Sequence, residues 1–151
     1  MTHPEDSALT PDATLSTDAP GQASRNPFAD HVGFRLESAA PGHSAGRLQI
    51  EPRHLNPNGV LHGAVLYAMA DTGMGAAVFP TLVAGELCAT IEIKMTYFKA
   101  IVRGEVVCRT VLVNRGKRVA YLESSAYAGE VLLAKASGTY AIFKPSQSSS
   151  A

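Results

Sequence analysis

The feature that most constrains the fold is a long apolar segment in the middle of the chain, between Asn56 and Pro80. From Gly63 to Phe79, Asp71 is the one side chain that carries a charge at neutral pH. The large apolar residues are spread around a 3.6-residue helical wheel, which is typical of a helix buried on every side. Pro80 should end this helix, because its ring lacks an N–H and clashes with the preceding turn. We therefore expect a central core helix with other elements packed around it.

The length of this segment leaves two interpretations, a membrane span or a buried helix of a globular domain. About 18 apolar residues are marginal for crossing a bilayer. Eight of the residues from Gly63 to Phe79 are alanine or glycine, and the flanks lack the basic and aromatic residues that anchor a span. We therefore expect a core helix, whose small side chains let neighbouring backbone approach closely.

Asp71 is the main functional clue in this helix. A carboxylate in apolar surroundings loses its hydration and needs an ion-pair partner or hydrogen bonds. Such carboxylates gather at active sites, although capping and structural hydrogen-bond networks also produce them. The sequence favours a catalytic or ligand-binding role for Asp71 over a structural one.

Composition indicates a single globular domain that attracts neither nucleic acid nor membranes through net charge. The chain has 151 residues, of which 46% are hydrophobic, and its 13 basic and 13 acidic residues cancel. Its two cysteines, Cys88 and Cys108, have no zinc-binding spacing, so no metal site is predicted. Free thiols, and an N-terminus without an apolar leader segment, favour a cytoplasmic protein.

Two polar tails are expected to flank the domain. Residues 1–25 are rich in Ser, Thr, Asp, Ala, Pro and Gly and contain almost no large apolar side chain. Such a segment buries too little surface to offset the entropy lost on ordering. We expect residues 1–25 and 145–151 to be disordered, and the folded domain to span residues 26–144.

Alternating apolar and polar residues predict strands on both sides of the helix. Before it, the alternation covers residues 32–37 and 45–50, separated by a Pro-Gly turn, which is typical of a hairpin. After it, a curled meander of four strands in series is expected, at residues 90–97, 105–114, 119–128 and 131–143. One antiparallel sheet folded around one long helix is an α+β arrangement.

The turn before the helix and the helix itself carry a recognisable motif. The chain contains Asn56-x-x-Gly59-x-x-His62-Gly63-Ala64, followed by Ala70-Asp71-Thr72. This pattern resembles the motif of hotdog-fold thioesterases of the PaaI-like, phenylacetate-degradation type. The resemblance covers residues 28–143 and implies a hotdog fold, in which a curled antiparallel sheet of five or six strands wraps one central helix. The chain departs from the family at three places, Ala64 for a glycine, Thr72 for the Glu of some members, and Phe98-Lys99-Ala100 for a basic-Pro pair.

The resemblance implies hydrolysis of an acyl-CoA thioester, with an aryl or medium-chain acyl group, coenzyme A as part of the substrate and no separate cofactor. Asp71 would activate water as a general base or attack as a nucleophile, and the sequence does not decide between the two. The N–H of Gly63, at the start of the helix, would stabilise the oxyanion. A glycine at that position also suits close helix packing.

The resemblance assigns three further residues to the site, and each has a structural alternative. Asn56 would assist the carbonyl group or the water, although Asn also favours turns. His62 would line the site near the thioester, or serve only as a polar residue at the helix start. Thr90 would hold the water, but the alternation places it on the face of Glu92 and Lys94, so a twist or bulge would be needed.

A cluster of basic residues follows the predicted strand at residues 105–114. Arg115, Lys117 and Arg118 lie in a predicted hairpin turn. They could contact the CoA phosphates, because cations at a loop tip suit a flexible anionic group. A turn that is only solvated would have the same composition.

Members of this family form dimers in which two sheets join and the sites lie between subunits. In such a dimer one chain would supply Asp71 and Thr90, and the other would supply Asn56, His62 and Gly63. We therefore expect a homodimer and, because many members are tetramers, a dimer of dimers.

Two other functions stay open. A hotdog hydratase of enoyl thioesters would need an Asp/His pair in an arrangement that this spacing does not supply. A non-catalytic domain that binds or senses acyl-CoA would keep the pocket but lack turnover. The sequence does not identify the acyl group.

Overall fold

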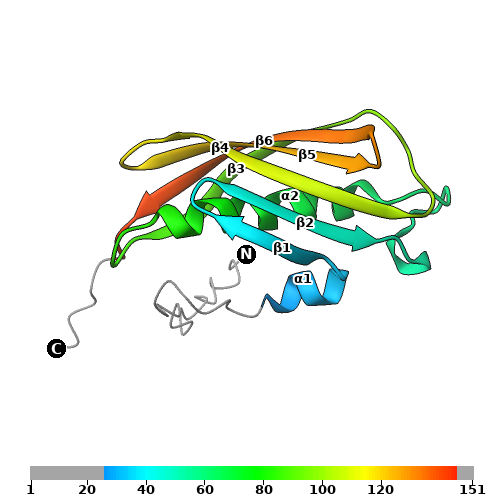
Figure 1. Ribbon diagram of the computed structural model, residues 1–151, viewed down its shortest axis with the longest axis horizontal. Helices are drawn as coiled ribbons and strands as arrows, with labels where there is room; N and C mark the ends of the chain where they lie inside the picture. Colours follow the sequence, from blue (N-terminus) through cyan, green and yellow to red (C-terminus); the bar gives the residue numbers. More distant parts are fainter. Residues whose placement is uncertain (1–25, 146–151) are drawn as a thin grey trace, which may run out of the picture.

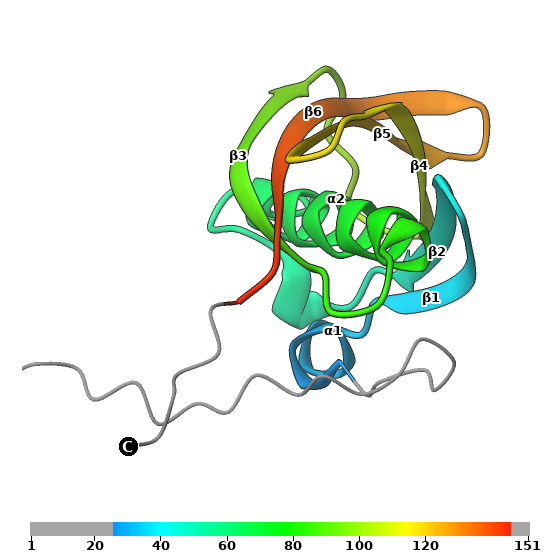
Figure 2. The same cartoon turned by 90° about the vertical axis from the view of Figure 1, so that its left-hand side faces the viewer.

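The structure, a computed structural model, describes residues 26–145 of the 151-residue chain. The predicted disordered tails, 1–25 and 145–151, lie outside the described residues except for Pro145. Helix α2 (Gly63–Val78) runs through the centre, and an antiparallel sheet of six strands curls around it (Figures 1 and 2). The predicted α+β arrangement of one sheet around one long helix is thus confirmed.

The sheet has the strand order β1-β2-β4-β5-β6-β3, and every neighbouring pair is antiparallel. The strands are β1 (Arg35–Ala40), β2 (His43–Gln49), β3 (Leu87–Tyr97), β4 (Glu105–Arg115), β5 (Val119–Ala128) and β6 (Val131–Phe143). The four predicted strands after the helix are all present, within a few residues of their expected limits. Their order differs from the prediction, because β3 pairs with β6 and not with β4. Alternation identifies the two faces of a strand but not its neighbours. The predicted meander of four strands is therefore wrong, and only β4, β5 and β6 form one.

The N-terminal strand begins later than predicted, because the residues before it form helix α1 (Pro27–Val32). Asn26 caps this helix, and its side-chain oxygen accepts a hydrogen bond from the N–H of Ala29 at 3.0 Å. Pro27 has the fixed φ that suits a first helical position, and Gly33 ends the helix with a φ of 84°. The interpretation of this region as strand is therefore wrong at its start, whereas the hairpin of β1 and β2 is confirmed.

Helix α2 begins at Gly63 and ends at Val78, and the expected stop, Pro80, lies in the 3₁₀ turn that follows, η2 (Phe79–Thr81). The sheet covers one side of the helix. Side chains on this side belong to the core and are buried: Leu66, Met69, Ala70, Gly73, Met74, Ala77 and Val78.

The opposite side of α2 is not covered by the chain itself, except at its border with β3 and β6, where these strands contact Asp71. Exposed or half-buried residues follow one another here at helical spacing and continue into η2: Ala64, Tyr67, Ala68, Asp71, Thr72, Gly75 and Phe79. The prediction that the helix is buried on every side is therefore wrong for a single chain. A helical wheel without a polar face shows that a helix avoids water, but not whether its own sheet or another molecule covers it.

Small residues bring α2 close to the sheet. The hydroxyl of Ser44 donates a hydrogen bond to the carbonyl oxygen of Gly73 at 2.7 Å, and a Cβ at Gly73 would lie 2.8 Å from Thr110 Oγ1. On β6, a Cβ at Gly138 would overlap the Sδ of Met74. These close contacts fix the rotation of the helix about its axis.

Two predictions made from composition concern the membrane and the cysteines. In the described part of the chain, no helix is long and apolar enough to cross a bilayer. Cys88 and Cys108 are both free, and burial raises the pKa of the Cys108 thiol to about 12. Cys108 therefore behaves as a small core side chain.

Candidate active site

Asp71 lies in the middle of α2, half-buried, on the side of the helix next to β3 and β6. The hydroxyl of Thr90 donates a hydrogen bond to Asp71 Oδ1 at 2.8 Å. The phenol oxygen of Tyr140 lies 2.6 Å from the same Oδ1 and 2.9 Å from the backbone carbonyl oxygen of Asp71. Within residues 26–145, no basic side chain forms an ion pair with Asp71, and its second oxygen, Oδ2, has no donor. The carboxylate is thus held by two hydroxyl donors on one oxygen.

A β-bulge in β3 turns Thr90 toward Asp71. The register between β3 and β6 shifts between Thr90 and Glu92, so that Ile91 has no direct partner on β6. In a regular strand, Thr90 would point to the same side as Glu92 and Lys94. The bulge that the sequence required for a role of Thr90 at the site is therefore present.

Tyr140 belongs to the same cluster, although the motif does not include it. It is the direct partner of Thr90 across β6 and β3, and only 3% of its surface is exposed. Burial and the hydrogen bond to Asp71 raise the pKa of its phenol, which therefore stays protonated and able to donate. The alternation in β6 could have identified this residue. That pattern places Tyr140 on the buried face with Ala136 and Ile142, and a buried phenol needs a partner.

His62 caps the N-terminus of α2. Its Nδ1 accepts a hydrogen bond from the N–H of Ala64 at 3.0 Å, and its carbonyl oxygen accepts one from the N–H of Val65 at 3.0 Å. An accepting Nδ1 carries no proton, so the ring's proton is on Nε2. His62 therefore has the structural role at the helix start, and its exposed Nε2–H is left for other contacts.

Gly63 has an unpaired N–H and a crowded Cα. No acceptor for this N–H is present among residues 26–145, so it is one of the free donors of the helix N-terminus. The carbonyl oxygen of Gly63 accepts a hydrogen bond from the hydroxyl of Tyr97 at 3.1 Å, and a Cβ would lie 3.0 Å from the Tyr97 ring. Close packing and an available oxyanion donor are therefore compatible at this glycine.

Asn56 organises the turn before the helix. Its side-chain Oδ1 accepts hydrogen bonds from the N–H of Asn58 at 2.9 Å and from that of Val60 at 3.4 Å. Its backbone N–H donates to the carbonyl of Val60, and its carbonyl accepts from the N–H of Gly59. The turn-forming alternative for Asn56 is thus realised. Its side-chain NH₂ group has no acceptor among the described residues.

Asp71 and Gly63 are too far apart in one chain to act on the same thioester. Asp71 follows Gly63 by eight positions in α2, which corresponds to about 12 Å along the helix axis. A nucleophile and an oxyanion donor must both reach one carbonyl group, whose carbon and oxygen are only about 1.2 Å apart. One chain therefore contains two separate groups, a carboxylate half-site (Asp71, Thr90 and Tyr140) and an amide half-site (Asn56, His62 and Gly63).

The basic turn between β4 and β5 is only partly free. Arg115 forms an ion pair with Glu86 at 2.8 Å and also donates to the carbonyl oxygen of Gly116. Lys117 and Arg118 are exposed, and neither forms an ion pair within residues 26–145. Two of the three predicted cations are therefore available to a phosphate group.

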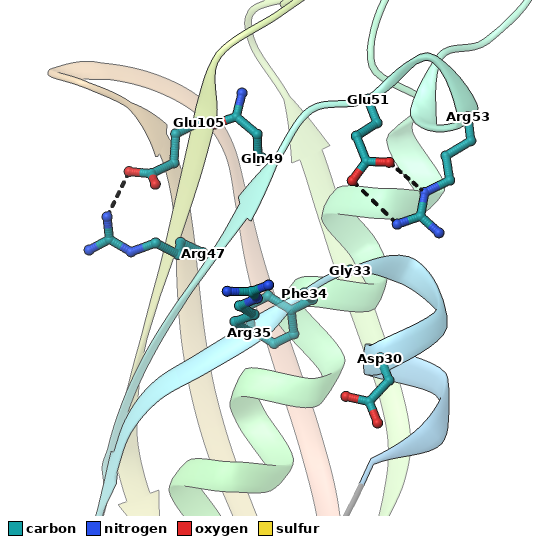
Figure 3. A pocket seen from close by; sticks show the side chains of 9 residues that line it. All are labelled: Asp30, Gly33, Phe34, Arg35, Arg47, Gln49, Glu51, Arg53 and Glu105. Atoms are coloured by element: carbon teal, nitrogen blue, oxygen red, sulfur yellow. Dashed lines mark hydrogen bonds and ion pairs between the residues drawn. The ribbon is translucent and has the colours of Figure 1, made fainter.

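Other candidate sites do not coincide with these half-sites. A cavity of about 460 Å³ lies between α1, β1, β2 and the 3₁₀ turn η1 (Pro52–His54), and no predicted site residue lines it (Figure 3). Its charges are largely paired, Arg47 with Glu105 at 2.8 Å and Arg53 with Glu51 at 3.1 Å. The residues that the structure describes contain no cluster of three or more His, Cys, Asp or Glu side chains suited to a metal ion.

Comparison with known proteins identifies relatives over most of the described chain. The model of the thioesterase superfamily matches residues 58–135. A curated protein of Archaeoglobus fulgidus, named as a candidate esterase, is 31% identical over 107 residues, which are 70% of this chain and 68% of that protein. A similarly named protein of Saccharolobus solfataricus is 27% identical over 118 residues, or 78% of either chain.

Solved structures have the same fold. The conserved protein PA5202 of Pseudomonas aeruginosa is 29% identical, with a TM-score of 0.76 over 79% of this chain and 95% of that chain. A mutant of the phenylacetic acid degradation protein PaaI of Thermus thermophilus is 27% identical, with a TM-score of 0.72 over 77% of this chain and 98% of that one. The family match covers more than half of the sequence. The predicted fold and enzyme class are confirmed with it, and the chain belongs to the thioesterase superfamily of hotdog-fold thioester hydrolases.

Proposed function

We propose that this protein is an acyl-CoA thioesterase, which hydrolyses an acyl-CoA to a free acid and coenzyme A with Asp71 as the central catalytic group. The observation that carries the proposal is the environment of the Asp71 carboxylate. Two hydroxyls hold its Oδ1, whereas its Oδ2 has no donor within residues 26–145. A carboxylate fixed in this way, on the uncovered side of α2, has one oxygen available for a water molecule or for the thioester carbon.

The chemistry needs one base and one oxyanion donor. In the general-base form, Oδ2 takes a proton from water while the water oxygen bonds to the thioester carbon. The carbonyl oxygen becomes an oxyanion, which the N–H of Gly63 would stabilise together with the field of the helix N-terminus. When the carbonyl re-forms, the C–S bond breaks and the CoA thiolate leaves. Because a thiol has a pKa of about 8.5, this leaving group needs little help from a general acid. In the nucleophilic form, Oδ2 bonds to the thioester carbon, and the C–S bond breaks with release of the CoA thiolate to leave an anhydride on Asp71. Water then hydrolyses this anhydride to the free acid and restores the Asp71 carboxylate.

A second copy of the chain is proposed to join the two half-sites. β3 is an edge strand of 11 residues whose side chains are mostly exposed, and such an edge is a template for pairing with another strand. Thr90 lies near the start of β3, and Tyr97, which contacts Gly63, lies at its end. Antiparallel pairing of two β3 strands about a twofold axis between these positions would bring Asp71 and Thr90 beside the partner's Gly63.

The uncovered side of α2 supports the same arrangement. β3 forms the sheet edge opposite the β1 edge, with α2 enclosed between them (Figure 2). A dimer joined at β3 would cover the exposed Tyr67 and the half-buried Ala68 and Gly75 on this side of α2. Assembly of two dimers into a tetramer is an expectation from the family alone.

The CoA moiety is proposed to extend toward the turn between β4 and β5. Lys117 and Arg118 are exposed there without ion-pair partners in the described chain, so they suit the CoA phosphates. Arg115 would support the turn from behind through its ion pair with Glu86. A thiol-release assay with a panel of aryl- and medium-chain acyl-CoAs would identify the preferred acyl group.

The central test is Asp71→Asn, which keeps the shape of the side chain and removes its negative charge. We expect this variant to fold, to bind acyl-CoA, and to lose most of its turnover in a thiol-release assay, because an amide can neither take the proton nor attack. A carboxylate on the β5–β6 turn provides the matched control, Glu130→Gln, which should hydrolyse at the wild-type rate.

Three results would contradict the proposal in different ways. Turnover of Asp71→Asn at the wild-type rate would exclude Asp71 as the catalytic group. A wild-type protein that binds acyl-CoA in a calorimeter but releases no thiol from any member of the panel would be a binding or sensing domain. Neither binding nor thiol release would exclude acyl-CoA as the ligand.

A further inference from the structure

We infer that Tyr140 is a positioning residue of the proposed thioesterase, whose phenol fixes Oδ1 of Asp71 so that Oδ2 is the oxygen that reacts. The inference rests on the proposed function and assigns a role to a residue outside the Asn56–Thr72 motif. On this inference, Oδ1 of Asp71 holds the carboxylate in place and Oδ2 takes part in the reaction.

The Tyr140 phenol contacts Asp71 at two atoms, and we call this pair of contacts a clamp. The phenol oxygen is 2.6 Å from Oδ1 of Asp71 and 2.9 Å from the backbone carbonyl oxygen of the same residue. One donor thus reaches both the side chain and the main chain of Asp71, which leaves little freedom for rotation about the bonds between them. The ring cannot move away easily, because Tyr140 is almost fully buried in the core beside Ala120 and Leu122.

Thr90 completes the arrangement from the adjacent strand. Thr90 and Tyr140 are register partners on β3 and β6, and both hydroxyls point to Oδ1. An oxygen that accepts two hydrogen bonds has little capacity left for a proton or for a new bond. Oδ2 accepts none within residues 26–145, so its lone pairs are left for a proton or for a new bond.

The protonation state of Tyr140 suits a permanent donor. Burial and the neighbouring Asp71 raise the pKa of the phenol, and the Cys88 thiol, whose own pKa burial also raises, acts on it in the same direction. The hydrogen bond with Thr90 acts in the opposite direction but is the smaller effect, and no basic side chain pairs with Asp71 in the described chain. The phenol therefore keeps its proton at neutral pH.

The test is Tyr140→Phe, which removes the hydroxyl and keeps the ring in the core. Without the clamp the carboxylate can rotate and exchange its oxygens, so kcat should fall about tenfold to a hundredfold while KM changes little. Tyr121→Phe is the matched control on the outer face of β5, and it should leave both kcat and KM unchanged.

A second variant, Thr90→Val, tests whether the two hydroxyls act on one oxygen. With Thr90 removed, Tyr140 is the remaining donor to Oδ1, so Tyr140→Phe should lower kcat by a larger factor in this background than in the wild type. Thermal unfolding of each variant shows whether the fold is kept.

The outcomes separate this inference from the proposed function. If the wild type shows no thiol release, the proposed function fails and the inference fails with it. If the wild type is active and folded Tyr140→Phe keeps its kcat, the inference alone is wrong. Equal effects of Tyr140→Phe in the wild-type and Thr90→Val backgrounds would likewise contradict a shared anchoring of Oδ1.

Discussion

At the scale of single residues, Gly63 meets a packing demand and a chemical one at the same position. Tyr97 packs on its Cα and donates to its carbonyl oxygen, so a side chain is disfavoured. His62 caps the next residue rather than Gly63, which leaves the Gly63 N–H without an acceptor in the described chain. The two demands can be separated by substitution, because alanine keeps the N–H and proline removes it.

We predict that Gly63→Pro lowers kcat by about a hundredfold or more relative to Gly63→Ala, because it removes an oxyanion donor. Proline is favoured at the first helical position, and His62, with φ −68° and ψ 131°, already has the conformation that precedes proline. Both variants add a Cβ against Tyr97, so this contact cancels in the comparison. Steady-state kinetics with one acyl-CoA measures the ratio. Equal kcat values would show that the Gly63 N–H does not act in catalysis.

The sequence could predict some site residues better than others, for physical reasons. Asp71 is prominent because a charge in an apolar helix needs an explanation, and the structure supplies partners for it. Thr90 could be predicted as a site residue only if its strand contained a bulge, because regular alternation would point its side chain away from the helix. Tyr140 was missed because a tyrosine in a strand has an ordinary structural explanation, and the pairing of β6 with β3 was not known.

At the scale of elements, the extents of most elements and the pairing of strands joined by tight turns were predictable, whereas the pairing of β3 with β6 was not. The limits of α2 and of β3 to β6 follow from local signals, namely proline, turn residues and alternation. The position of β3 beside β6 depends on contacts that are distant in sequence, which local patterns do not contain. Helix α1 was missed although Asn26 and Pro27 are a cap and a first-turn signal, because the alternation that starts at Val32 was given more weight.

The close approach of β1 and β2 gives a prediction for stability. In β2, a Cβ at Gly46 would overlap the ring of Phe34 and lie 2.7 Å from the backbone carbonyl oxygen of Arg35. Backbone cannot move aside as a flexible side chain can, so Gly46→Ala should lower the free energy of unfolding by about 1 to 3 kcal/mol. Denaturant titration measures the change, with Ala45→Ser on the other face of β2 as the control. An unfolding curve of Gly46→Ala equal to that of the wild type would show that the hairpin adjusts freely.

At the scale of the whole molecule, the chain has an open strand edge and an uncovered helix side next to each other. The proposed dimer, in which the carboxylate half-site of each chain faces the amide half-site of the other, would cover both features together. The sequence indicated this only through the family, because an apolar residue has the same identity whether its own chain or another chain covers it.

Mixed dimers of two inactive variants test the shared site. Asp71→Asn lacks the carboxylate half-site and Gly63→Pro lacks the amide half-site, so each homodimer should be nearly inactive. In a hybrid of the two, one site combines both intact halves and the other combines both damaged halves, and activity should reappear on co-expression. Sites contained within one chain would give no recovery, since neither chain has both groups. A different affinity tag on each variant allows the hybrid dimers to be isolated by two successive purification steps.

The length of α2 between Gly63 and Asp71 also has a consequence for how activity depends on the concentration of the protein. On the proposed arrangement, a monomer contains every catalytic group but cannot cleave a thioester. The rigid helix keeps its Asp71 carboxylate and its Gly63 N–H too far apart to act on one carbonyl group. Dilution below the dissociation constant of the dimer should therefore inactivate the enzyme without unfolding the chain. The total rate of thiol release would then fall steeply in that range, as the square of the protein concentration rather than in proportion to it.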